Sequence, residues 1–161
     1  MIILGIDPGS RNCGYGILHI EQNKILAAGS GIIKLATRLN INDKLLLLGQ
    51  EIQLLLHEYQ PDFSAVEQIF YGKNIQTAFI LGHVRGVIIY KLKEANVSVF
   101  SYSPREIKQS LTGKGSASKK QVEFMVQSIL KLKKPALEDA ADGLACALCL
   151  YNKERLLLGK K

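Results

Sequence analysis

The sequence contains few cysteines: three in 161 residues, an odd number. So few thiols cannot build the disulfide framework typical of small secreted domains. Cys146 and Cys149 form a C-x-x-C pair, but it falls inside a helical pattern and no second pair accompanies it. A redox pair usually lies at a helix N-terminus, and a zinc site needs further ligands. We therefore interpret both residues as small core residues.

Long apolar runs are also missing. Arg85 and Asn152 interrupt the longer apolar stretches, so none reaches the length that spans a membrane. Met1 is followed directly by a strand-like run, without the basic segment and cleavage site of a signal peptide. No low-complexity tract or linker divides the chain. These absences predict a cytoplasmic protein with one domain over residues 1–155 and a short basic tail at 156–161.

Acidic residues are outnumbered by basic ones. The 14 Asp and Glu face 21 Lys and Arg, which gives a formal net charge of +7 and a pI near 9.3. This balance suits nucleic acid or an anionic membrane surface as partner. The composition is otherwise that of a globular protein, 47% hydrophobic and 22% charged, so the charge does not come from a disordered basic tail. We expect a folded domain with a negatively charged partner.

Turn-forming residues divide the first third of the chain into three strands, whose short connections predict an antiparallel meander. Apolar residues at helical spacing then predict helices that alternate with two further strands. We expect strands at 2–7, 13–20, 25–33, 63–67 and 97–102, and helices at 39–59, 75–94, from 104, at 122–132 and at 135–154. This order predicts an α/β fold with a five-stranded mixed sheet.

Two of the helix starts carry explicit signals. Ser103 and Glu106 have the spacing of a capping box, and Ser118 and Gln121 repeat it. Between these helices, residues 112–118 are rich in glycine and polar residues, so we expect them to form the most mobile loop. The loop does not have the spacing of a phosphate-binding P-loop.

Four acidic residues occur where the chain is otherwise apolar or where a helix begins. Asp7 and Glu67 each close an apolar strand, and Asp139 and Asp142 share one face of the last expected helix. Strand ends are where α/β sheets bind ligands, so a helix start packed across them would gather all four acids. Buried carboxylates cost several kcal/mol unless they pair or bind a cation. We therefore expect a metal site there.

Each acid taken alone has a simpler interpretation. Acids near a helix N-terminus are common because the helix dipole stabilises them, and Glu67 at a strand end can point into solvent. Taken together, four oxygen donors without a histidine favour Mg²⁺ or Mn²⁺ over zinc. Two such ions about 4 Å apart activate a water and stabilise the leaving oxygen in phosphodiester hydrolysis. That chemistry accounts for the acids and for the excess of basic residues.

Several motifs occur in an order that is more specific than any of them alone. They are Ile-Asp-Pro-Gly-Ser-Arg-Asn-Cys-Gly-Tyr-Gly at 6–16, Val-Glu-Gln-Ile-Phe at 66–70, Lys73-Asn74, Gln76-Thr77-Ala78, Ser103-Pro104 through Lys108, Thr112-Gly113 to Val122, and Asp-Ala-Ala-Asp at 139–142. From Met1 to about Tyr151 the chain resembles the RuvC family of bacterial Holliday-junction resolvases.

The resemblance implies an RNase H-like fold, with helices on both faces of the sheet, and a homodimer that binds a four-way DNA junction. It also implies a crossover junction endodeoxyribonuclease that makes paired, symmetric nicks in recombination and DNA repair. Two Mg²⁺ ions per active site are implied, with Mn²⁺ as a substitute, and a branch-migration motor complex is a further candidate partner. The residues that match the catalytic, metal-binding acids of the family are Asp7, Glu67, Asp139 and Asp142.

The resemblance also supplies candidates for DNA contact. Phe70 matches an aromatic that stacks on a junction base, although it could instead anchor a loop to the core. Lys108 and Lys119 match basic residues needed for cleavage. The lysines around the glycine-rich loop form either a phosphate clamp or a solvated charge cluster. The full candidate set is Phe70, Lys73, Asn74, Lys108, Lys114, Lys119 and Lys120.

Three glycines within expected helices raise separate questions. Gly82 and Gly86 are four residues apart in an apolar helix, and they serve either a contact between subunits or packing within one subunit. Gly143 occupies a position where the family usually has alanine. Glycine in a helix costs roughly 1 kcal/mol relative to alanine, so we expect the helix to be softer beside Asp142.

Two other classes of function match part of this pattern. A non-catalytic junction-binding module would share the basic surface but would not need the carboxylates. A phosphotransferase of the actin and sugar-kinase type also ends its first strand in an Asp-x-Gly turn. That fold needs two such domains, and this chain has about half the required length.

Overall fold

The computed structural model describes residues 1–22, 24–69 and 75–158, without the side chains of residues 28 and 155–158. Within this part the strands form one mixed sheet in the order β3-β2-β1-β4-β5. β1, β2 and β3 are antiparallel neighbours, and β4 and β5 run parallel to β1. The predicted antiparallel meander and mixed sheet are confirmed. The strands are β1 Ile2–Asp7, β2 Asn12–Glu21, β3 Lys24–Lys34, β4 Phe63–Glu67 and β5 Ser98–Tyr102.

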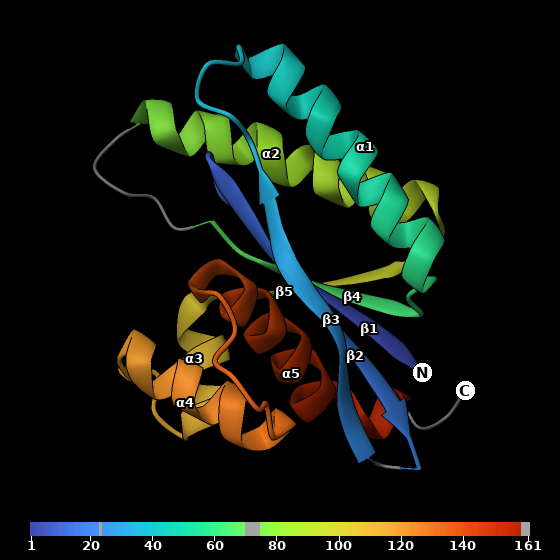
Figure 1. Ribbon diagram of the computed structural model, residues 1–161, viewed down its shortest axis with the longest axis vertical. Coiled ribbons are helices and arrows are strands. Elements are labelled where there is room, and N and C mark those ends of the chain that lie inside the picture. Colours follow the sequence, from blue (N-terminus) through green and yellow to red (C-terminus); the bar gives the residue numbers. More distant parts are fainter. Residues whose placement is uncertain (23, 70–74, 159–161) are drawn as a thin grey trace.

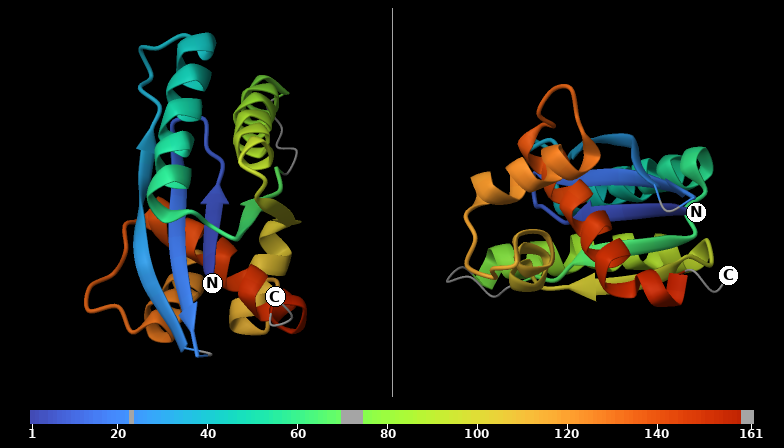
Figure 2. Two further views of the ribbon diagram at one scale, coloured as in Figure 1. Left: turned by 90° about the vertical axis from the view of Figure 1, so that its right-hand side faces the viewer. Right: turned by 90° about the horizontal axis from the view of Figure 1, so that it is seen from below.

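Helices cover both faces of this sheet, as expected. α1 and α2 lie on one face, and α3, α4 and α5 lie on the other (Figures 1 and 2). Side chains alternate along each strand, so Ile3 joins the core under α5 while Leu4 joins the core under α1 and α2. No helix of the described residues is long and apolar enough to cross a membrane. The helices are α1 Ile41–Tyr59, α2 Ile75–Glu94, α3 Pro104–Thr112, α4 Lys119–Leu130 and α5 Glu138–Leu158.

Local sequence signals account for most helix starts. Both capping boxes form: Ser103 with Glu106 begins α3, and Ser118 with Gln121 begins α4. In each, the serine oxygen accepts a backbone N–H of the first turn, and the Glu or Gln side chain accepts the N–H of the serine. α4 ends two residues earlier than expected because Lys131 takes the left-handed conformation, with a φ of 50°.

The expected start of the last helix was wrong. α5 begins at Glu138, not at Pro135. Residues up to Leu137 carry the chain from α4 to the sheet, and Pro135 lines a hollow of about 210 Å³ against α4. The helix also runs to Leu158, four residues farther than expected, because residues 153–158 are all good helix formers and the next glycine or proline is Gly159. Residues 156–158 of the expected basic tail are therefore helical.

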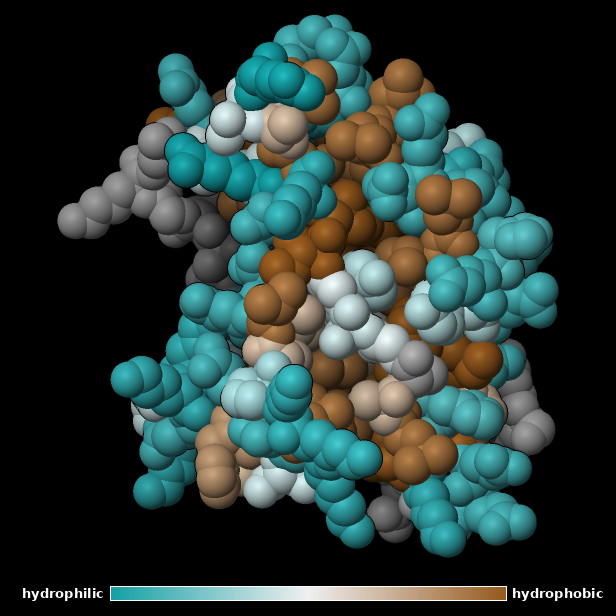
Figure 3. All heavy atoms as spheres, viewed as in Figure 1, coloured by the Kyte–Doolittle hydropathy of each residue, from teal (hydrophilic) through white to brown (hydrophobic). Residues whose placement is uncertain are grey.

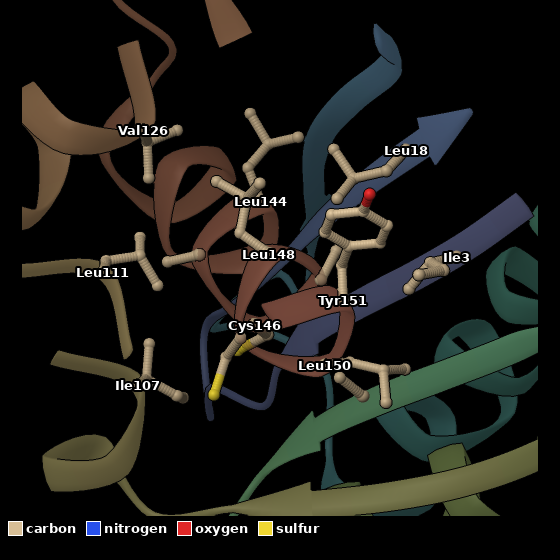
Figure 4. Close-up of a cluster of buried hydrophobic side chains, with 14 of the residues drawn as sticks. Ile3, Leu18, Ile107, Leu111, Val126, Leu144, Cys146, Leu148, Leu150 and Tyr151 are labelled. Atoms are coloured by element: carbon tan, nitrogen blue, oxygen red, sulfur yellow. The ribbon is translucent and has the colours of Figure 1, made fainter. Parts of the chain in front are cut away.

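α5 is the central helix of its face of the sheet. Ile107 and Leu111 of α3 and Val126 of α4 point toward Leu144 and Leu148, which are fully buried (Figure 4). Burying a leucine of this kind contributes about 1.5–3 kcal/mol. On the same helix, Cys146 and Cys149 are 1% and 0% exposed and free of disulfides, which confirms that they are core residues.

Glycines let α5 approach the strands closely. A Cβ on Gly14 would lie 1.7 Å from the carbonyl oxygen of Asp139, and one on Gly143 would lie 2.5 Å from the backbone of Tyr15. Gly143 therefore has a packing role that the sequence did not indicate. Gly82 and Gly86 differ, since a Cβ at either would meet no atom within 4 Å in the described structure. Among the described residues, close packing within one subunit gives no reason for glycine at either position.

Candidate active site

The four acids meet at one edge of the sheet. β1 and β4 are parallel neighbours paired through Ile6 and Val66, so the residues that follow, Asp7 and Glu67, end the two strands side by side. The other two acids come from the first turns of α5, which the glycine contacts hold against β1 and β2. The fold thus brings the ends of β1 and β4 and the start of α5 to the same edge of the sheet. Those two acids are Asp139 and Asp142.

The carboxyl group of Asp7 lies at the centre of this cluster. Burial and, after it, the negative charge of Asp142 raise its pKa to about 7, with Lys119 acting in the opposite direction and Asp139 adding a smaller rise. Opposite and like charges act on a carboxyl group most strongly where little water lies between them. The charges of two acids of α5 and of a lysine of α4 thus all act on Asp7.

Glu67 experiences a similar environment. Burial raises its pKa to about 8, with smaller contributions from Asp7 and Asp142, and Lys108 and Lys119 act in the opposite direction. The Cys146 thiol lies 4.0 Å from Oε2 of Glu67, with the sulfur as donor. Two partly buried acids with raised pKa values on neighbouring strands are typical of a functional site rather than of a solvated surface.

Two lysines complete the cluster. Lys108 and Lys119 line a hollow of about 160 Å³ together with Glu67 and Asp142. The Nζ atom of Lys119 lies 2.8 Å from Oδ2 of Asp142 and 2.7 Å from Oε1 of Glu138. Burial lowers the pKa of Lys119, but these two hydrogen bonds outweigh it and raise the pKa overall. The two lysines matched to basic residues needed for cleavage thus lie beside the acids.

Polar contacts that sequence reasoning missed support two of the acids. Asn12 donates from Nδ2 to Oδ2 of Asp139 over 2.9 Å. Arg85 donates from Nε to the carbonyl oxygen of Glu67 over 3.2 Å and from Nη2 to the hydroxyl of Ser101 over 2.8 Å. Arg85 did carry a signal, because it is a charged residue in an otherwise apolar helix. For Asn12, the available signal was its position two residues before Gly14, which places both residues on the same face of a strand.

The donor set fits a hard divalent cation in its chemistry. Its ligands are carboxylate oxygens, which Mg²⁺ prefers, and burial and mutual repulsion make their anionic forms unfavourable without a positive charge. Lys119 supplies one such charge at Asp142. As they stand, no three His, Cys, Asp or Glu side chains in the described ranges are grouped tightly enough to hold a metal ion. The metal-binding roles therefore stay predictions.

The other candidates for DNA contact do not lie among the acids. Lys114 is exposed, and its backbone is tied to the hydroxyl of Thr112. Lys120 is exposed on α4 and lines the hollow beside Phe124. In Figure 3, hydrophilic residues cover the lower left, where α4 lies in Figure 1. The remaining candidates lie outside the described residues: Phe70, Lys73 and Asn74.

Comparison with known proteins identifies the family that shares this fold. The family model described as crossover junction endodeoxyribonuclease RuvC matches residues 3–150. The chain belongs to the RuvC family. RuvC from Ruminiclostridium cellulolyticum is 40% identical over 162 residues, which cover 99% of this chain and 98% of that protein. The RuvC family comprises metal-dependent nucleases.

Solved RuvC structures share the architecture. The Thermus thermophilus RuvC structure superposes with a TM-score of 0.88 at 31% identity, over 97% of this chain and 96% of that one. The T. thermophilus RuvC in complex with a Holliday junction substrate gives a TM-score of 0.87 at 28% identity, with the same coverage. The predicted RNase H-like fold is confirmed.

Proposed function

We propose that this protein is a crossover junction endodeoxyribonuclease that resolves Holliday junctions by paired, symmetric nicks in recombination and DNA repair. The observation that carries the proposal is the meeting of four carboxylates and two lysines at one sheet edge, in a chain of the RuvC family. The complex of a T. thermophilus relative with a Holliday junction supports a four-way junction as the substrate.

In this proposal Asp7, Glu67, Asp139 and Asp142 hold two Mg²⁺ ions, or Mn²⁺ in their place. When bound, such ions supply an activated water and stabilise the leaving oxygen. The residues themselves define the reaction centre. Asp7 shares its surroundings with acids from β4 and α5, so it is placed to serve both halves of the site.

Lys108 and Lys119 have a separate task in the proposed reaction. Both line the hollow that also contains Glu67 and Asp142, so an ammonium group can approach a phosphate held against the acids. A fixed positive charge at that place lowers the energy of the extra negative charge that develops in phosphodiester cleavage. We assign both lysines to charge stabilisation rather than to general DNA affinity.

The remaining basic and aromatic candidates are assigned to DNA binding. Lys114 and Lys120 are exposed, Lys120 in the first turn of α4 and Lys114 in the loop before it. Contacts of this kind hold the phosphate backbone and release counterions, so they favour binding at low salt. The proposed contacts with junction bases and backbone ahead of α2 are made by Phe70, Lys73 and Asn74.

We propose that the protein acts as a homodimer through one face of α2. Val84, Ile88 and Leu92 of this helix are buried against the sheet. On another face, residues at spacings of three and four form a stripe that we call the α2 stripe. Its large members are 71%, 67% and 62% exposed, and its two glycines leave open space above the helix. In chain order the α2 stripe is Ile75, Phe79, Gly82, Gly86 and Tyr90.

Three further assignments belong to the same proposal. The protein works in the cytoplasm, which agrees with three cysteines that are all free thiols. Residues 1–155 act as a single nuclease domain, with hydrophobic cores on both faces of one sheet. A branch-migration motor complex is its proposed protein partner.

Asp7→Asn tests the proposed activity. With a synthetic four-way junction, the variant should bind as well as the wild type, because the substitution keeps the shape and removes only the charge. Cleavage with Mg²⁺ should be lost, and nicks mapped on the wild-type reaction should be symmetric and absent with chelator or linear duplex. Cleavage by the variant at the wild-type rate would sink the assignment.

A further inference from the structure

The ammonium group of Lys119 has two acceptors that differ in their surroundings. Asp142 is the inner one, with a side chain that is 22% exposed, and Glu138 is the outer one, at 68%. The two acids are four residues apart on α5 and therefore adjacent on one face of the helix. Lys119 Nζ contacts both acids at once, over 2.8 Å to Asp142 and 2.7 Å to Glu138, while its side chain lines the hollow.

Only the inner acceptor belongs to the acid cluster. The charge of Asp142 acts on both Asp7 and Glu67, and its carboxylate lines the hollow with Glu67 and Lys119. Glu138 is the first residue of α5 and its pKa is lowered by the hydrogen bond from Lys119. Lys119 thus already bonds Glu138, an acceptor that lies outside the acid cluster.

A divalent cation and Lys119 compete for Asp142. An ammonium group 2.8 Å from Oδ2 of Asp142 would face a second positive charge once that oxygen coordinated a metal. Without another acceptor, Lys119 would lose its ion pair and turn into solvent. With Glu138 present at 2.7 Å, it keeps one ion pair and stays beside the reaction centre.

We propose that Glu138 is a positioning residue that holds Lys119 at the rim of the hollow when a divalent cation takes Asp142. The inference rests on the proposed function, in which Asp142 is a metal ligand and Lys119 stabilises charge on the phosphate. Glu138 touches neither metal nor DNA in this scheme, and its whole effect passes through Lys119.

A general charge effect is the alternative that the test must separate. Removing any carboxylate near the cluster weakens cation binding by electrostatics alone. Glu123 of α4 offers a matched control, because its charge acts on Asp142 and no ion pair with Lys119 is seen in the described structure. A double-mutant cycle then isolates the part of the effect that depends on Lys119.

The experiment is calorimetric titration of the full-length protein with Mn²⁺ at pH 8.5, without DNA. Glu138→Gln should weaken Mn²⁺ binding by up to about 5-fold, the upper end expected from an exposed ion pair. Lys119→Met should bind Mn²⁺ more tightly than the wild type, and adding Glu138→Gln to it should change affinity no more than adding Glu123→Gln. Glu138→Asp, which keeps the charge, should recover most of the affinity.

Cleavage rates supply a second readout. With Mn²⁺ at saturating concentration and junction bound, Glu138→Gln should lower the single-turnover rate and leave junction affinity unchanged, because Lys119 is no longer held beside the phosphate. Glu123→Gln should leave that rate at the wild-type value.

Two results would overturn the inference, and they are distinguishable. If Asp142→Asn binds Mn²⁺ as the wild type does, the proposed metal site fails and this inference fails with it. If Asp142→Asn loses Mn²⁺ but Glu138→Gln has the same effect with and without Lys119, the metal site stands and only the role of Glu138 is refuted.

Discussion

Asn12 donates a hydrogen bond from Nδ2 to Oδ2 of Asp139 over 2.9 Å, which joins the first residue of β2 to the second residue of α5. The two residues are 127 positions apart in the chain. Hydrogen bonds to charged groups are the stronger ones in proteins, so this contact restrains the carboxylate of Asp139. The geometry of one candidate metal ligand therefore depends on a strand at the other end of the chain.

Asn12→Ala should slow cleavage on the order of tenfold, since a hydrogen bond to a carboxylate contributes roughly 1.5–3 kcal/mol. Junction affinity should not change, because the substitution removes no charge and its effect passes through Asp139. Single-turnover cleavage at saturating Mg²⁺ measures the effect. Asn152→Ala is the matched control, as that amide bonds Ser110 instead. A rate equal to that of the wild type would remove Asn12 from the site.

The stability of the metal-free protein should fall as pH rises. Burial raises the pKa of Asp7 to about 7 and that of Glu67 to about 8, whereas the unfolded chain releases these protons near pH 4. Between pH 4 and 8 the folded state binds more protons than the unfolded state, so the free energy of unfolding decreases with pH.

Asp7→Asn tests this directly, because it removes one of the two groups. With chelator present, the variant should exceed the wild type in free energy of unfolding by about 1–3 kcal/mol at pH 8. The two proteins should be equal near pH 4. Urea unfolding at both pH values measures the difference, with the exposed Glu21→Gln as a control for loss of charge. A stabilisation that is the same at both pH values would show that ionisation of Asp7 does not cause the loss of stability.

Divalent metal affinity should increase with pH over the same interval. The raised pKa values mean that Asp7 and Glu67 carry protons below about pH 7 and pH 8, respectively, and a metal must displace them. Mn²⁺ titrations in buffers of different ionisation enthalpy should show release of one to two protons at pH 6.5 and almost none at pH 9. Proton release that does not vary with pH would show that other groups bind the ion.

Gly14→Ala should displace α5 or destabilise the fold by about 2–4 kcal/mol. The new methyl group would lie 1.7 Å from the carbonyl oxygen of Asp139, which is backbone and cannot rotate away. Both the unfolding free energy and the cleavage rate should fall. Gly82→Ala is the matched control, because its Cβ meets no described atom within 4 Å and alanine favours a helix. Equal stability of the two variants would refute the close approach of α5.

Gly82→Lys should separate dimerisation from folding. In the monomer the side chain has open space and the helix gains roughly 1 kcal/mol over glycine, so the thermal midpoint should hold or rise. At the proposed α2 stripe, two charged side chains would block the approach of the subunits. Light scattering should report a monomer for this variant and a dimer for Gln109→Lys, which adds the same charge on α3. A dimeric Gly82→Lys protein would place the interface elsewhere.

Local patterns predicted the elements well. β4 Phe63–Glu67 and α2 Ile75–Glu94 lie where periodicity placed them, and both capping boxes form. These features depend on neighbours within a few residues, so a single sequence contains the necessary information. The start of α5 was wrong because Pro135 is compatible with a helix start, while in the structure Leu132 and Ala136 pack against the core ahead of the helix.

By itself, the sequence determined which residues carry the chemistry: four acids at strand ends and a helix start, basic residues in known motifs, and a net charge of +7. Only the tertiary structure decided how they meet. The approach of α5 through Gly14 and Gly143, the hydrogen bond from Asn12 to Asp139, and the two acceptors of Lys119 all join distant segments. Such contacts depend on how whole elements pack, and no local pattern encodes the distance between a strand and a helix more than a hundred residues apart.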